Sequence, residues 1–147
     1  MKYTTEVTIE LSRQSVIELF DNVDNMYKWQ EGLKSCEHIE GEPGEVGSRS
    51  MLVYEGRRGD LKMTETITKR NFPDEYHADY KARGVHNQVN NYFTEAGAEQ
   101  TTWRMVNIFR FNGLMALMAP FMKTAFSSNT LLNMERFKSF AEQSKNL

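Results

Sequence analysis

Residues 113–143 read GLMALMAPFMKTAFSSNTLLNMERFKSFAEQ and carry the strongest helix signal in the chain. The first half of this segment is almost wholly apolar and rich in methionine, and apolar residues recur at helical spacing throughout. We expect Pro120 to kink the helix or to end its first part, and residues 127–130 to offer a second break. An apolar helix of this length in a protein of 147 residues must lie across a sheet, which predicts a cavity between the two.

The residues before this helix predict the sheet. Residues 2–11 alternate apolar and polar side chains, as expected of a strand with one buried face. Ser12 is suited to cap a short helix that runs to about Asn22, and a second short helix or turn follows near residues 24–29. From residue 48 to residue 110, strand-like segments alternate with short turns in the manner of an antiparallel meander. The turns are expected at residues 56–60, 72–75, 82–85 and 95–99.

These elements predict an α+β fold within a single domain over residues 1–147. We expect a curved antiparallel sheet of about seven strands wrapped around a long C-terminal helix, with two short helices after the first strand. The glycine-rich segment GEPGEVGS, residues 41–48, favours a connection between strands. A phosphate-binding loop would instead require a following lysine and helix, and this segment has neither.

Composition excludes several classes of function. Eighteen basic and twenty acidic residues are interspersed to a formal net charge of −2, and no run of Lys or Arg predicts nucleic-acid binding. The single Cys36 fits a reducing compartment, and the N-terminal residues lack the apolar block of a signal peptide, so we expect a cytoplasmic protein. Residues 114–122 are too short to span a bilayer, which argues against stable membrane insertion. Membrane dipping by this segment is a weaker alternative because its cationic flanks are sparse.

Polar residues interrupt the apolar faces of the predicted strands. Glu65, Asn87, Asn91 and Asn107 each share a phase with apolar neighbours. Buried polar groups of this kind need partners, which they find in each other, in water or in a ligand. An apolar cavity with a few orienting polar groups fits the pattern. Alternatively, a β-bulge shifts the phase of a strand and these side chains face solvent.

The methionine and phenylalanine residues of the C-terminal helix also allow two interpretations. They pack as ordinary core, or they form the roof of a cavity, and one helix is able to do both at different positions. On the second interpretation, sheet and helix together predict fourteen ligand-binding residues. These are Met63, Glu65, Tyr80, Asn87, Val89, Asn91, Trp103, Met105, Asn107, Phe109, Leu114, Met118, Phe121 and Met122.

Common catalytic and cofactor motifs are not found in the sequence. There is no Gly-x-Ser-x-Gly elbow, Cys36 has no motif-placed histidine partner, and the three histidines lack metal-ligand spacing. We therefore expect no metal and no nucleotide or flavin cofactor. If Glu65 is buried, its pKa should rise, which makes it a candidate proton donor or hydrogen-bond anchor.

The predicted order of strand, two short helices, antiparallel strands and closing helix resembles the START-like (SRPBCC) superfamily with its helix-grip fold. The matching segments are residues 3–35, the GEPGEVGS loop, and LLNMERFKSFAE at 131–142. The similarity covers essentially the whole chain and is greatest to small bacterial polyketide cyclase/dehydrase-like members. It implies a hydrophobic cavity between sheet and helix, and it implies no catalytic set that can be carried over residue by residue.

Three functions follow as hypotheses. The favoured one is binding or transport of a small hydrophobic molecule, such as a lipid, an isoprenoid or a polyketide-like compound. The first alternative is a polyketide cyclase or dehydratase in which Glu65 or a tyrosine moves protons. The second is an interaction module similar to the chaperone-activator branch of the superfamily, which predicts a filled core. No pattern in the sequence specifies an oligomeric state.

Overall fold

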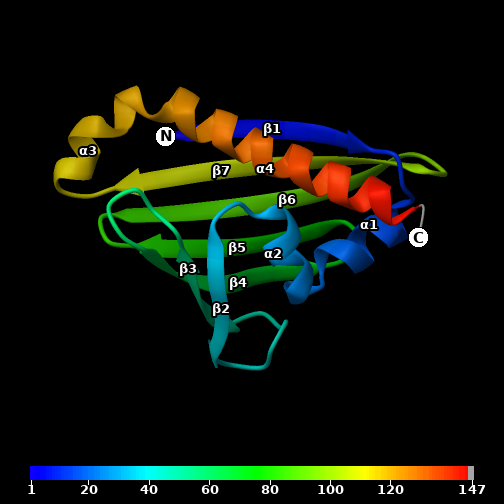
Figure 1. Ribbon diagram of the computed structural model, residues 1–147, viewed down its shortest axis with the longest axis horizontal. Coiled ribbons are helices and arrows are strands. Elements are labelled where there is room, and N and C mark those ends of the chain that lie inside the picture. The colour runs from blue at the N-terminus through cyan, green and yellow to red at the C-terminus, as the bar shows by residue number, and fades with distance from the viewer. Residues whose placement is uncertain (146–147) are drawn as a thin grey trace.

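The computed structural model describes residues 1–145 and contains one seven-stranded antiparallel sheet crossed by a long C-terminal helix (Figure 1). This is the predicted α+β fold. The strands are β1 (Lys2–Ile9), β2 (Leu33–Glu40), β3 (Arg49–Tyr54), β4 (Leu61–Asn71), β5 (Glu75–Ala82), β6 (Val85–Gly97) and β7 (Gln100–Phe111). The helices are α1 (Arg13–Phe20), η1 (Val23–Asn25), α2 (Met26–Trp29), α3 (Leu114–Met118), η2 (Ala119–Phe121) and α4 (Lys123–Ser144).

The sheet is a meander of strands β2 to β7, and β1 is added at the β7 edge. Strands β2 to β7 neighbour one another in chain order, and β1 pairs with β7, so the spatial order is β1-β7-β6-β5-β4-β3-β2. The register runs from Lys2 opposite Ile108 to Ile9 opposite Thr101. β1 and β2 are therefore the two edges, and α1 and α2 connect them across one face of the sheet (Figure 1).

Local signals explain the two short helices and the glycine-rich loop. The Ser12 hydroxyl accepts a hydrogen bond from the Ser15 amide at 3.2 Å, which satisfies a free donor at the start of α1. The Asn22 side chain does the same for η1 through the Asp24 amide. Residues 41–48 connect β2 to β3, as the sequence predicts.

The C-terminal segment differs from a single helix. Gly113 has a φ of +61°, a left-handed conformation that glycine adopts without steric cost, and the chain turns there from β7 into α3. Pro120 lies in η2, and α4 begins at Lys123, so the break expected at the proline is confirmed. The break expected at residues 127–130 is wrong, because α4 runs through them without interruption. In the described part of the chain, no helix is long and apolar enough to cross a membrane.

The core occupies one end of the space between sheet and helix. Its fully buried side chains come from β1, α1, β6, β7 and the C-terminal half of α4. The ring of Phe20 lies within 6.5 Å, between centroids, of six other aromatic rings. Those six are Trp29, Phe72, Tyr76, Phe93, Trp103 and Phe137. Edge-to-face packing of this kind adds to the area that the rings bury.

Candidate ligand-binding cavity

A cavity of about 1350 Å³ lies beside this core. Its floor is the inner face of strands β3 to β7, and α2, β2 and the N-terminal half of α4 complete its walls. The volume exceeds that of ordinary packing defects and suits a ligand of drug size or larger.

The predicted sheet residues all line this cavity. Each comes from a strand on which alternate side chains face inward, and the inward phases agree with the expectation. The ten residues concerned are Met63, Glu65, Tyr80, Asn87, Val89, Asn91, Trp103, Met105, Asn107 and Phe109. Trp103 belongs to the core as well, because it is fully buried where the cavity ends.

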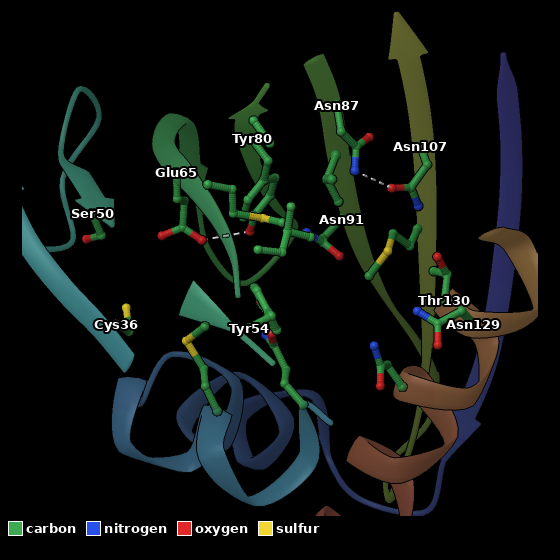
Figure 2. Close-up of a pocket in the computed structure, with 18 of the residues that line it drawn as sticks. Cys36, Ser50, Tyr54, Glu65, Tyr80, Asn87, Asn91, Asn107, Asn129 and Thr130 are labelled. Atoms are coloured by element: carbon green, nitrogen blue, oxygen red, sulfur yellow. Dashed lines mark hydrogen bonds between the residues drawn. The ribbon is translucent and has the colours of Figure 1, made fainter. Parts of the chain in front are cut away.

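A row of polar side chains crosses the floor. The register places Ser50 opposite Glu65, Glu65 opposite Tyr80, and Tyr80 opposite Asn87. The Tyr80 hydroxyl donates a hydrogen bond of 2.7 Å to Oε2 of Glu65. In Figure 2 the other carboxyl oxygen of Glu65 points away from Tyr80, toward the side where Ser50 lies. One oxygen of this carboxyl group is therefore held by Tyr80, and the side chain as a whole lines the cavity.

Burial controls the protonation of this row. Desolvation raises the pKa of Glu65, and the hydrogen bond from Tyr80 opposes that shift by a smaller amount. Desolvation and then the charge of Glu65 raise the pKa of Tyr80 well above its ordinary value. The carboxyl group therefore keeps its proton to a higher pH than an exposed glutamate does, while the phenol stays neutral.

Several polar groups near Glu65 were not predicted as site residues. Cys36, Tyr54 and Tyr76 line the same part of the cavity, and the Tyr54 hydroxyl donates a hydrogen bond to the Gln30 amide oxygen. Desolvation and the charge of Glu65 raise the pKa of the Cys36 thiol to about 11. Burial and Glu65 also raise the pKa values of both tyrosines. Tyr76 shares the strand phase of Tyr80, and that phase is the signal that would have identified it.

A second polar group consists of three amides. The Asn87 side-chain nitrogen donates to Oδ1 of Asn107 at 3.2 Å (Figure 2). The other amide atoms, Oδ1 of Asn87 and Nδ2 of Asn107, are buried and have no hydrogen-bond partner within the described chain. Oδ1 of Asn133, from α4, is in the same condition. An unpaired buried polar atom costs about 1–3 kcal/mol. A small rotation of these side chains toward the cavity that they line would offer a donor and two acceptors to a ligand or to water.

Asn91 differs from these three amides. Its Oδ1 accepts a hydrogen bond of 2.9 Å from the Trp103 indole nitrogen, and both groups are buried. Asn91 therefore orients a core ring, although its side chain also touches the cavity.

The predicted helical residues lie outside the cavity wall. Leu114, Met118 and Phe121 are 82%, 54% and 81% exposed, and Met122 joins η2 to α4 away from the lining. The turn at Gly113 carries α3 past the end of the sheet, so within α3 and η2 only Met115 reaches the cavity.

The helical wall comes from the following helix, α4. Its cavity-lining residues are Phe126, Asn129, Thr130, Asn133 and Met134. They recur at spacings of three and four residues, which is the periodicity of one helix face and would have identified them. The Thr130 hydroxyl is hydrogen-bonded to the Tyr3 hydroxyl at 2.7 Å, so this part of α4 is fixed to β1.

The lining sets limits on the chemistry. Over residues 1–145, no group of three or more His, Cys, Asp or Glu side chains is placed to hold a metal ion. The cavity instead offers a large apolar surface, one carboxyl group with a raised pKa, several neutral phenols and a set of unpaired amide atoms. These groups are able to bind an apolar molecule, to hydrogen-bond its oxygen atoms and to donate a proton.

Comparison with known proteins places the chain in a family. Residues 1–142 match the family described as polyketide cyclase / dehydrase and lipid transport. No curated protein matches the sequence.

Solved structures share the fold at low sequence identity. A protein from Thermus thermophilus is 12% identical with a TM-score of 0.80, over 98% of this chain and 99% of that one. ZhuI aromatase/cyclase from Streptomyces sp. R1128 is 13% identical with a TM-score of 0.79, over 97% and 94%. A START superfamily protein from Mycobacterium smegmatis is 10% identical with a TM-score of 0.79, over 97% of both chains. At these identities the likeness establishes the fold.

Proposed function

The chain belongs to the polyketide cyclase/dehydrase and lipid transport family, and on that premise we propose that it binds a small hydrophobic molecule in the cavity between sheet and α4. The proposed ligand is a lipid, an isoprenoid or a polyketide-like compound that carries at least one oxygen function. The ten predicted residues that line the cavity remain proposed ligand contacts. The cavity-lining residues of α4 replace the other four, which are Leu114, Met118, Phe121 and Met122.

The unpaired amide atoms in a largely apolar cavity carry this proposal. Apolar lining favours a hydrophobic molecule by about 25 cal/mol for each Å² of apolar surface buried. Asn87, Asn107 and Asn133 add unpaired hydrogen-bonding atoms, which a ligand oxygen or hydroxyl group is able to satisfy. A purely apolar ligand would leave them unpaired, so we expect an amphiphilic one.

Native mass spectrometry of the protein purified from its own host tests the proposal. We expect a bound molecule at one per chain, which extraction then identifies. Uptake of the fluorescent probe N-phenyl-1-naphthylamine provides a second measurement. A protein that is empty as purified and takes up no probe would contradict the binding function.

A matched pair of variants on β4 locates the binding site. Met63 faces the cavity, and Thr64 is the next residue on the same strand, outside the cavity lining. We expect Met63→Trp to fill part of the cavity and lower probe affinity by about tenfold. Thr64→Trp should leave the affinity close to that of the wild type. Equal affinities for the two variants would place the probe elsewhere.

A second candidate function is catalysis of the cyclase or dehydratase kind. The hydrogen bond between Tyr80 and Glu65, together with the raised pKa of Glu65, favours it. A protonated carboxyl group beside the ligand is able to protonate a carbonyl or a departing hydroxyl oxygen, and the carboxylate that remains is able to accept a proton from carbon. Turnover of a poly-β-ketone substrate that persists in Glu65→Gln would rule out this mechanism.

We do not propose the interaction-module function. That hypothesis predicts a filled core, whereas the structure contains a cavity of about 1350 Å³.

A further inference from the structure

An apolar surface lies on the segment between β7 and α4. Leu114, Leu117, Met118 and Phe121 are 82%, 71%, 54% and 81% exposed, and together they form what we call the α3–η2 patch. Large apolar side chains gathered in this way mark a site that interacts with a protein, a membrane or a ligand. Elsewhere the exposed large apolar side chains are spread over other elements.

The α3–η2 patch lies at one opening of the cavity. Met115, in the same short helix, lines the cavity together with Arg57 of the β3–β4 turn and Arg83 of the β5–β6 turn. A Cβ atom placed on Gly84 would lie 3.3 Å from the Met115 side chain, so that turn touches α3. Figure 1 shows α3 beyond the end of the sheet, near the β3–β4 turn.

The opening is positively charged. Arg57, Arg58, Arg83 and Lys123 lie at this end of the molecule, all are exposed, and none forms an ion pair within residues 1–145. The chain has no Asp or Glu between Glu99 and Glu135, which is the span that contains the α3–η2 patch.

Two carboxylates belong to the β3–β4 turn region. Asp60 is already held by Lys34 at 3.0 Å, and Glu55 follows the last residue of β3. The basic residues therefore outnumber the acidic ones here, although the formal net charge of the whole chain is −2. The positive charge is concentrated where the apolar side chains are exposed.

We propose that the α3–η2 patch docks the protein on the surface of an anionic membrane, with the cavity opening toward the lipid. Leucine and phenylalanine side chains of short interfacial helices enter the headgroup boundary, and basic side chains around them contact anionic headgroups. The combination of apolar tip and basic rim complements that surface in both respects. The α3 and η2 helices are too short to span the bilayer, so the docking is peripheral and reversible.

The charge distribution favours a membrane over a second copy of the chain. A two-fold dimer through this patch would gather the basic residues of both copies around one interface. Like charges facing each other oppose such an interface, whereas phosphatidylserine headgroups neutralise them. Docking in this orientation would let a ligand pass between bilayer and cavity without crossing water.

Vesicle flotation tests the docking. We expect the wild-type protein to float with vesicles of 70% phosphatidylcholine and 30% phosphatidylserine, and to bind pure phosphatidylcholine more weakly. The double variant Leu117→Ser/Phe121→Ser should lose about a hundredfold in binding, since it removes two apolar side chains that enter the lipid. The matched control Ile39→Ser/Val46→Ser removes two exposed apolar residues from another part of the surface and should bind as the wild type does.

Charge and fluorescence give independent measurements. Arg58→Glu should weaken binding to the anionic vesicles by at least about fivefold, and 0.5 M KCl should weaken wild-type binding in the same direction. Phe121→Trp should shift its emission to shorter wavelength on vesicle addition, whereas Val46→Trp should not. Unchanged emission from Phe121→Trp, or equal flotation of the patch and control variants, would overturn the proposal.

Two outcomes separate this inference from its alternatives and from the proposed function. A dimer seen by sedimentation, which Leu117→Ser/Phe121→Ser abolishes while vesicle binding stays absent, would assign the patch to self-association and overturn membrane docking. Uptake of N-phenyl-1-naphthylamine from aqueous solution should be unchanged in that double variant, because neither residue lines the cavity. If the wild type takes up no probe, the proposed binding function is contradicted. Vesicle binding by the α3–η2 patch is then judged by the flotation result alone.

Discussion

The two ends of the space under α4 are built from the same sheet and the same helix, yet one is filled and the other is hollow. At the filled end, Phe93, Trp103 and Phe137 are at most 2% exposed; Phe93 stacks on Trp103, and Phe137 packs edge-to-face against Trp103. At the hollow end, inward positions on the same strands β6 and β7 carry Asn87 and Asn107, and α4 contributes Asn133. Strand phase decides which side chains point inward, and side-chain size and polarity decide whether the space closes.

The largest expected difference between the ends is in stability. Phe137→Ala removes a fully buried ring from the filled end and should lower the free energy of unfolding by about 3–5 kcal/mol. Phe126→Ala, on the same helix but in the cavity wall, should cost only about 1–2 kcal/mol, because one side of that ring already faces open space. Urea unfolding of both variants measures the two losses. Equal losses would mean that the hollow end is as tightly packed as the core.

Substitution of one amide at each end should show the same difference in stability. Asn91→Leu leaves the Trp103 indole nitrogen without its acceptor in a buried site, so we expect a loss of about 1–3 kcal/mol. Asn107→Leu removes an amide nitrogen that has no partner, and it also removes the acceptor of the 3.2 Å hydrogen bond from Asn87. Because Asn87 lines the cavity, water is able to replace that acceptor, and stability should stay within about 1 kcal/mol of the wild type.

The same two variants should differ in ligand binding. Asn107→Leu is expected to weaken the binding of an oxygen-bearing ligand, because the substitution removes a hydrogen-bond donor from the cavity. A strong loss of stability in Asn107→Leu, with little in Asn91→Leu, would reverse the assignment of the two amides. Differential scanning calorimetry with and without the extracted ligand measures both quantities.

Glu65, at the hollow end, should make the free energy of unfolding depend on pH. Desolvation raises the folded-state pKa of Glu65, so the folded protein binds this proton more tightly than the unfolded chain does. The contribution to stability is therefore full below the unfolded pKa of glutamate and is lost as pH rises through the higher folded pKa. Glu65→Gln should remove that decline and become the more stable protein as the pH increases. Urea midpoints between pH 4 and pH 9 provide the test, and parallel curves for the two proteins would be inconsistent with a buried carboxyl group.

The smallest effect on stability is expected at Cys36, where the measured quantity is the reactivity of the thiol. Because burial and Glu65 raise its pKa to about 11, little thiolate exists at pH 8. We expect iodoacetamide to react about a hundredfold more slowly than with an exposed cysteine of ordinary pKa. Mass spectrometry against a cysteine-containing peptide measures the ratio. A bound ligand should slow the reaction further, and a rate equal to that of the peptide would place the thiol in water.

The inward faces of the sheet were predictable because strand alternation is uninterrupted there. The register shifts between Ile67 and Lys69 and between Glu95 and Gly97 lie outside the segments that carry the polar cavity residues. The assignment of Glu65 to the inner face therefore holds, and the alternative of a solvent-facing phase does not.

The C-terminal region was less predictable for a different reason. Helical periodicity shows that Leu114, Met118 and Phe121 share a face, but it does not show where that face points. The turn at Gly113 sets the direction, and it depends on how β7 ends against the β5–β6 turn. The basic residues around the patch were not predictable for a similar reason. Arg57 and Arg83 lie far from Lys123 in the sequence, and only the fold brings the three to the same end of the molecule.

The pairing of β1 with β7 has a consequence for synthesis on the ribosome. Lys2 lies opposite Ile108, so β1 leaves the ribosome long before β7, the strand that pairs with it. The helix that covers β1 emerges later still, and it brings Met134 and Phe137 to the core. Closing so long a loop is slow. We therefore expect the nascent chain to complete its core and its cavity together, in one late step, and to leave the apolar face of β1 uncovered until then.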